Sequence, residues 1–187
     1  NLTIGNTYYI RIWSNSPNSQ VVTFDLCVKP VSSCQNAAPF CGADVSNPYI
    51  YANTTELEDL SQVACLGSIP NPTFYTLRVD QTGDLSFTIL QNTSFDASGN
   101  PNGTNLDVDF VAWGPFDSPE SCSQIAFSDC PTCPNNTTNQ GFYPFGNIVD
   151  CSYDASFTET LTINGAVAGQ YYIILVTNFS NDPGLIS

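Results

Sequence analysis

Apolar and polar residues alternate along most of the chain, and this period of two is typical of half-buried β-strands. The clearest run is Asn105–Phe116, with the sequence NLDVDFVAWGPF. Its alternate positions are apolar and acidic: Leu106, Val108 and Phe110 on one face, Asp107 and Asp109 on the other. The run therefore predicts a core strand that carries two carboxylates on its outer face and is ended by the turn-forming pair Gly114-Pro115.

Further alternating runs predict an all-β protein. The predicted strands are Tyr8–Trp13, Val22–Val28, Asn71–Val79, Asp84–Gln91, Thr158–Ile163 and Gly169–Phe179, with a strand just starting at Leu185–Ser187. Tyr171–Val176 is apolar on both faces, as expected of a central strand. Asp80–Gly83 is a turn, so the two strands that flank it are expected to pair as a hairpin. The only expected helical turn is short and lies within Asn53–Leu60.

The chain is expected to divide into two unequal parts. Residues 1–30 would be the C-terminal hairpin of a preceding β-sandwich, because a hairpin alone is only marginally stable in water. Residues 31–33 would be a linker, and residues 34–187 a β-sandwich of jelly-roll or immunoglobulin-like type with a truncated final strand. An internal repeat supports this division, since Gly5–Ile12 resembles Gly169–Val176. Convergence on a common strand pattern would give the same likeness.

The charge of the chain excludes several partners. The formal net charge is −14, yet only 11% of the residues are charged, and the basic ones are Arg11, Lys29 and Arg78. Nucleic acid is not an expected partner, because too few side chains can neutralise phosphates. Direct membrane insertion is not expected either, since no apolar run reaches the length of a membrane helix. A divalent cation is the natural counter-charge.

Eight cysteines in a chain of 187 residues indicate an oxidising compartment. All of them are expected in disulfides: Cys27, Cys34, Cys41, Cys65, Cys122, Cys130, Cys133 and Cys151. About a hundred pairings exist for eight cysteines. Short loops favour Cys41–Cys65, Cys122–Cys151, Cys130–Cys133 and Cys27–Cys34. The CxxC spacing of Cys130 and Cys133 could also serve redox work or zinc, but the chain has no second such pair and no βαβ setting.

Catalysis is not expected. The sequence contains no histidine, which excludes Ser/His/Asp and Cys/His relays. Asp107 and Asp109 could be compared with the carboxylate pair of glycoside hydrolases, but such a pair lies on separate elements across a cleft. Two carboxylates on one strand face are more often a rim or a set of cation ligands.

Calcium is the candidate cofactor, with Asp96, Asn100, Asp107 and Asp109 as candidate ligands. Oxygen-bearing side chains recur at alternate positions from Asp96 to Asn102, and Asp107 is twelfth from Asp96, as in an EF-hand loop. Pro101 at the glycine position and the strand-like flanks reject a true EF-hand. The alternative is an ordinary hairpin loop with two solvated aspartates.

Trp113 and Phe116 are the candidate ligand-binding aromatics. Exposed rings could stack on sugars, which would make surface glycans a partner, whereas buried rings would fill the ends of the core.

Several motifs resemble a known module. They are CQNAAPFC (34–41), ACLGSIPNP (64–72), LDVDFVAWGPF (106–116), DCSY (150–153) and GQYYIILVTNFS (169–180). Together these motifs resemble a β-sandwich module of large cell-surface, adhesin-like proteins of Bacteroidetes. Residues 1–29 are similar to the end of a fibronectin- or pre-peptidase-like β-domain.

The resemblance implies export by the type IX route and display on the cell surface, in proteins of gliding and attachment. It supplies no catalytic residues. We therefore expect a structural, adhesive stalk or fibre repeat that contacts neighbouring copies or domains of its own protein. The edge after Ile186 is a candidate place for strand addition by a neighbour. A carbohydrate-binding module attached to a secreted enzyme is the alternative.

Overall fold

The computed structural model describes residues 34–40, 50–53, 63–125 and 142–187. The strands within these ranges are β1 (Ala38–Phe40), β2 (Tyr51–Asn53), β3 (Thr73–Arg78), β4 (Gly83–Asn92), β5 (Val108–Phe116), β6 (Ile148–Ser152), β7 (Thr158–Ala166), β8 (Tyr171–Asn178) and β9 (Gly184–Ile186). The same ranges contain the 3-10 helices η1 (Cys34–Asn36) and η2 (Ser121–Gln124), and no helix in them is long and apolar enough to cross a membrane. The hairpin expected in residues 1–30, the linker at 31–33 and most of the expected helical turn lie outside the described residues.

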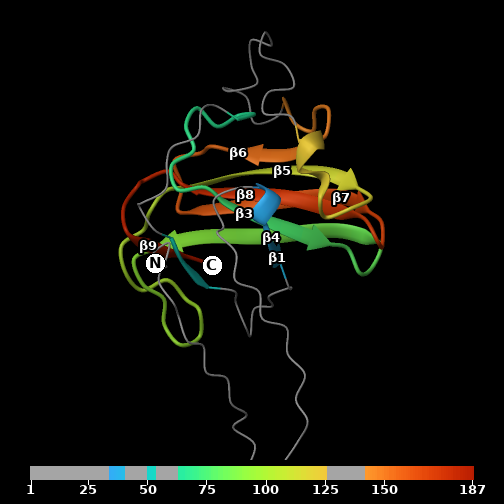
Figure 1. Ribbon diagram of the computed structural model, residues 1–187. Helices are drawn as coiled ribbons and strands as arrows, with labels where there is room; N and C mark the ends of the chain where they lie inside the picture. Colours follow the sequence, from blue (N-terminus) through green and yellow to red (C-terminus); the bar gives the residue numbers. More distant parts are fainter. Residues whose placement is uncertain (1–33, 41–49, 54–62, 126–141) are drawn as a thin grey trace, which may run out of the picture.

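The strands form two sheets, as expected of a β-sandwich. The five-stranded sheet has the order β1-β3-β8-β5-β6, and the four-stranded sheet has the order β2-β9-β4-β7. All pairs are antiparallel except β1 with β3. The long strands run roughly side by side across Figure 1, where β6 lies at the top above β5. The prediction of an all-β, disulfide-stapled, antiparallel-rich sandwich is confirmed.

The core between the two sheets is built from the inward faces of both. Its buried residues are Tyr75, Leu77, Val79, Ile89, Val108, Phe110, Ala112, Leu161, Ile163, Ala166, Tyr172, Ile174, Val176 and Ile186. Val108 and Phe110 face this core, as the alternation in Asn105–Phe116 predicts. The apolar residues of β4 and β7 come from the same period-two pattern.

A second apolar layer covers the other face of the five-stranded sheet. It is made of Cys34, Ala37, Val63, Ala64, Cys65, Leu66, Ile69, Phe74, Val111, Trp113, Phe116, Ile125, Ile148, Cys151, Ile173 and Leu175. The loop at residues 63–69 and the segment before β1 supply the covering side, and β3, β5, β6 and β8 supply the sheet side. Strand β8 contributes to both layers and pairs with β3 and β5, so the prediction of a central strand at Tyr171–Val176 is confirmed.

The predicted hairpin across Asp80–Gly83 is wrong. Strands β3 and β4 form as expected, but they belong to different sheets. The segment after β3 pairs with the approach to β8 instead: the Val79 N–H donates to the Gln170 carbonyl (2.9 Å) and the Gly169 N–H to the Val79 carbonyl (2.8 Å). Alternation fixes which face of a strand is buried, but it does not choose the neighbour.

Both ends of β5 differ from the prediction, because the strand begins at Val108 and not at Asn105, and it does not stop at Gly114. The strand continues through Gly114 and Pro115 to Phe116, with a shift of register against β8 after Trp113. Gly114 has φ +151°, and a Cβ there would lie 2.8 Å from Cε1 of the buried Tyr172 ring. Only glycine lets the two backbones approach so closely at this point.

Candidate functional site

The two aspartates of β5 lie in different environments. Asp109 is only 2% exposed, and its Cα pairs with that of the fully buried Thr177 on β8. Its Oδ1 atom is buried without a hydrogen-bond partner. Asp107 is half-buried and accepts a hydrogen bond from the Ser156 N–H at 3.1 Å. The alternative to a cation site, two solvated aspartates, is therefore wrong for Asp109.

Burial and neighbouring carboxylates change the acidity of both groups. Loss of solvent raises the pKa of Asp109 to about 8, and the charges of Asp107, Glu159 and Asp154 add to the rise. Burial also raises the pKa of Asp107, although its hydrogen bond from Ser156 opposes the rise. Asp109 is therefore a carboxyl group that holds its proton at neutral pH.

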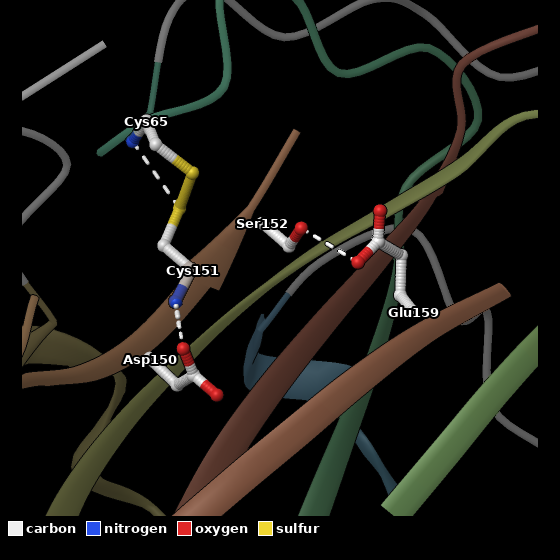
Figure 2. Close-up of a disulfide and its surroundings, with 5 residues drawn as sticks. All are labelled: Cys65, Asp150, Cys151, Ser152 and Glu159. Atoms are coloured by element: carbon white, nitrogen blue, oxygen red, sulfur yellow. Dashed lines mark hydrogen bonds between the residues drawn. A yellow bond between two sulfur atoms is a disulfide. The ribbon is translucent and has the colours of Figure 1, made fainter. Parts of the chain in front are cut away.

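A second group of carboxylates bridges the edges of the two sheets. Asp150 on β6 accepts hydrogen bonds from the Cys151 N–H (2.9 Å) and from the Thr162 N–H of β7 (2.7 Å). Ser152 Oγ donates to Glu159 Oε2 at 2.6 Å, also from β6 to β7. Figure 2 shows Cys151 and Ser152 pointing to opposite sides of β6. These bonds join the outermost strands of the two sheets.

Burial raises the pKa of Asp150 and Glu159 as well. Glu159 is 7% exposed, and its Oε1 atom is buried without a hydrogen-bond partner. A polar hollow of about 460 Å³ at this edge is lined by both carboxylates and by Tyr143. Asp107 and Asp109 do not line it.

Asp96 and Asn100 form a closed turn of their own. Asp96 Oδ1 accepts hydrogen bonds from the N–H groups of Ser98 (2.8 Å) and Asn100 (2.9 Å). The Asn100 side chain donates to Asp96 Oδ2 at 3.1 Å. These donors, the Asn100 N–H first, lower the pKa of Asp96, whose side chain is fully solvated.

The four candidate calcium ligands therefore form two separate pairs, Asp96 with Asn100 and Asp107 with Asp109. The carboxylates that raise the pKa of Asp109 are Asp107, Glu159 and Asp154, and Asp96 is not among them. Within the described ranges, no three or more histidine, cysteine or acidic side chains are grouped so that they could hold a metal ion. Calcium binding stays a prediction.

Trp113 and Phe116 are buried in the outer apolar layer. Trp113 is 0% exposed and Phe116 is 6% exposed. Neither ring has a free face for a sugar, so the interpretation of these residues as a stacking platform is corrected. They fill the core, which was the alternative left open by the sequence.

Two disulfides lie at the outer layer: one fastens the loop at residues 63–69 to β6 of the five-stranded sheet, and the other joins η1 to η2. They join Cys34 to Cys122 and Cys65 to Cys151, with sequence separations of 88 and 86 residues. The expected pairs Cys41–Cys65, Cys122–Cys151 and Cys27–Cys34 are therefore wrong. The preference for short loops failed because the outer layer brings distant segments together over one sheet face. Cys130 and Cys133 lie outside the described residues.

Each residue of the DCSY motif has a structural role. Asp150 binds the edge of β7, Cys151 forms a disulfide, Ser152 binds Glu159, and Tyr153 packs against the outer layer. Sequence reasoning noticed the motif but missed the bonds of Asp150 to β7 and of Ser152 to Glu159, because these bonds depend on how the two sheets pack.

An apolar cleft opens between the sheets beside β4, and sequence reasoning did not foresee it. Its volume is about 730 Å³. It is lined by Phe40, Tyr51, Tyr75, Ser86, Phe87, Thr88, Ile89, Leu90, Ser98, Gly99, Asn100, Leu161, Ile174, Val176, Ile186 and Ser187.

Known proteins give no guide to these features. No family model, curated protein or solved structure matches the chain. The disulfides, the edge carboxylates and the cleft must therefore support any functional conclusion by themselves.

Proposed function

We propose that the chain is a structural, adhesive module of a secreted, surface-displayed multidomain protein, and that it acts as a stalk or fibre repeat. The observation that carries this proposal is the pair of interlocked disulfides. Along the chain their cysteines alternate in the order Cys34, Cys65, Cys122, Cys151, so each bridge closes a loop that contains one end of the other.

Interlocked bridges suit a module that must transmit tension. Force applied to the two ends of the chain is carried by the disulfides before the strands between the bridged cysteines can separate. Closing long loops also stabilises the fold, by about 4 kcal/mol for each bridge in the chain-entropy account. Disulfides of this kind persist outside the cell, which agrees with an extracellular location on the cell surface.

The motifs of the chain support the bacterial setting of the proposal. Because the motifs resemble Bacteroidetes adhesin-like modules, we infer export by the type IX route and a role in attachment or gliding. Calcium would stiffen the module further by neutralising the acidic end of β5, where Asp109 Oδ1 and Glu159 Oε1 are buried without partners.

Force spectroscopy on the full chain, held by its two termini, tests the proposal. With both disulfides intact, the segment from Cys34 to Cys151 can extend through only about 30 residues, or roughly 100 Å. After reduction the same segment should release roughly 400 Å. The proposal therefore expects unfolding in the oxidised protein to be shorter by about 300 Å than in the reduced protein. Equal extensions in the two states would contradict the proposal that the bridges carry tension.

A carbohydrate-binding module attached to a secreted enzyme remains the second candidate. The burial of Trp113 and Phe116 removes its original support, but the polar hollow with Tyr143, Asp150 and Glu159 offers an aromatic ring beside hydrogen-bonding groups. A glycan array separates the two candidates, because the stalk needs no glycan ligand.

A further inference from the structure

The two disulfides differ in how deeply they are buried. Cys65 and Cys151 are 1% and 2% exposed. Cys34 is 8% exposed, and Cys122 is only half-buried. We call Cys65–Cys151 the β6 bridge, because Cys151 lies in β6, and we call Cys34–Cys122 the η1–η2 bridge. Of these two bridges, only the η1–η2 bridge presents a cysteine with appreciable exposure to solvent.

The β6 bridge is enclosed by backbone hydrogen bonds. Val63 and Leu66 exchange two of them, at 3.1 and 2.8 Å, and so close the loop that carries Cys65. The Cys65 N–H donates to Cys151 Sγ at 3.3 Å, as Figure 2 shows. Cys151 itself pairs with Val111 of β5, within the five-stranded sheet. A reductant can therefore reach this bridge only after the loop or the sheet opens locally.

The η1–η2 bridge lies outside the strands. It joins η1, which has three residues, to η2, which has four. Ser123 and Gln124, which follow Cys122 in η2, are exposed. The rate of thiol–disulfide exchange depends on access to the sulfur that is attacked. Cys122 Sγ is therefore the expected point of attack on this protein, and no sheet has to open first.

The segment that carries Cys34 has few other attachments to the sandwich. We call residues 34–40 the β1 segment, since they contain η1 and β1. Its strand has three residues and lies at the edge of the five-stranded sheet, where it pairs with β3. Pro39 within it has no N–H to donate. Short edge strands belong to the less stable parts of a fold, so the disulfide is needed to keep this segment docked.

We propose that the η1–η2 bridge is a redox-sensitive switch for the β1 segment. A dithiol opens this bridge while the β6 bridge stays closed, and the β1 segment then detaches from β3. Reoxidation docks the segment again. The inference goes beyond the proposed stalk function, because it gives the two bridges different roles.

The exchange needs no reactant other than the dithiol. One thiolate attacks Cys122 Sγ, which breaks the S–S bond, releases Cys34 as a thiolate and forms a mixed disulfide with Cys122. The second thiol attacks the reductant's own sulfur in that mixed disulfide, which releases Cys122 and closes a disulfide within the reductant. Two electrons and two protons pass in total from the dithiol to the two cysteines.

Opening the η1–η2 bridge leaves the limit on extension in place. The chain from Cys34 to Cys65 and the chain from Cys122 to Cys151 are of nearly equal length. Tension on the two termini therefore meets the β6 bridge after about the same extension, whether the η1–η2 bridge is open or closed. The β1 segment can then be released without loss of the length limit that the stalk requires.

Timed reduction of the unaltered full chain tests the order of opening. The folded protein is treated with dithiothreitol, quenched in acid and alkylated with N-ethylmaleimide, and peptide mass spectrometry gives the labelled fraction of each cysteine. We expect the two cysteines of the η1–η2 bridge to be labelled together, at least about tenfold faster than those of the β6 bridge.

The same treatment in concentrated urea is the control. The four cysteines should then be labelled at similar rates, because burial no longer distinguishes the bridges. Equal rates in the folded protein, or earlier reduction of the β6 bridge, would overturn the proposal. A difference that persists in urea would overturn it as well, since burial would not be its cause.

Hydrogen exchange tests the release of the β1 segment. The buried Ala37 N–H donates to the Cys34 carbonyl at 3.0 Å in the closed state. In the double variant Cys34→Ser, Cys122→Ser, the Ala37 amide should exchange at least about tenfold faster than in the unaltered protein. The Ile174 amide is the internal control and should keep its protection, because β8 is paired on both sides.

Near-ultraviolet circular dichroism checks that the double variant is folded. If it is not, the same exchange is measured on the unaltered protein after selective reduction and alkylation. An Ala37 amide that keeps its protection in the sample measured would overturn the release of the β1 segment. Neither outcome changes the comparison of extension between the oxidised and the fully reduced protein, so the two proposals fail separately.

Discussion

A buried carboxyl group such as Asp109 is unfavourable when charged and tolerable when protonated. With a pKa of about 8 in the folded protein, against an ordinary value of 3.8, Asp109 binds its proton more tightly in the folded state. Folding then takes up a proton between these two values. The contribution of Asp109 to the free energy of unfolding is therefore most favourable at low pH and falls as the pH rises from about 4 to about 8.

Asp109→Asn should remove this pH-dependent loss. We expect the variant to melt at a higher temperature than the unaltered protein at pH 8 in chelator, and to differ little from it at pH 4. Thermal denaturation followed by circular dichroism measures both. Asp96→Asn is the control of opposite sign, because the pKa of Asp96 is lowered and its charge is favourable in the folded state.

A lower melting temperature for Asp109→Asn at pH 8 would contradict this account and would mean that the ionised carboxylate is needed. Stabilisation by added calcium that disappears in Asp109→Asn would instead establish the cation site.

Single elements show how far the sequence predicts the fold. Six predicted strands correspond to β3, β4, β5, β7, β8 and β9. Strands β3, β4, β5 and β7 carry a period-two pattern, whereas β8 was recognised from its continuous apolar run. The choice of neighbours could not be predicted, since any strand with one apolar face can pair on either side. The short strands β1 and β2 have only three residues each, which is too few to show a period.

The candidate site was less predictable than the strands. Asp107 and Asp109 were identified from their spacing, but their burial depends on β8 and on the segment at residues 153–156. The same limit applies to the cysteines, whose partners lie more than 80 residues away. Spacing along the chain reports local structure, and these contacts are not local.

The close approach of β5 to β8 gives a prediction at the scale of the element. Gly114→Ala should destabilise the protein by about 3 kcal/mol, because the new Cβ meets the buried Tyr172 ring and φ lies in the left-handed region. Urea unfolding gives the free energy. Gly67→Ala is the control, since a Cβ there meets nothing within 4 Å. Equal effects of the two substitutions on the free energy of unfolding would show that the contact with Tyr172 does not constrain β5 at Gly114.

The whole molecule combines three layers: the four-stranded sheet, the five-stranded sheet and the outer apolar layer. The inward faces of the two sheets hold the first two layers together, and the Cys65–Cys151 disulfide attaches the third layer to β6. The hydrogen bonds of Asp150 and Ser152 to β7 join the two sheets at one edge. The apolar cleft beside β4 separates the sheets at another edge.

In the proposed stalk, interlocked disulfides allow this sandwich to bear tension. Proteolysis of the unreduced protein followed by mass spectrometry tests it most directly, because cross-linked peptides reveal the pairing. We predict peptides that join Cys34 to Cys122 and Cys65 to Cys151, with no free thiol at these four residues. Peptides that join Cys41 to Cys65 or Cys122 to Cys151, or free thiols at these positions, would contradict it.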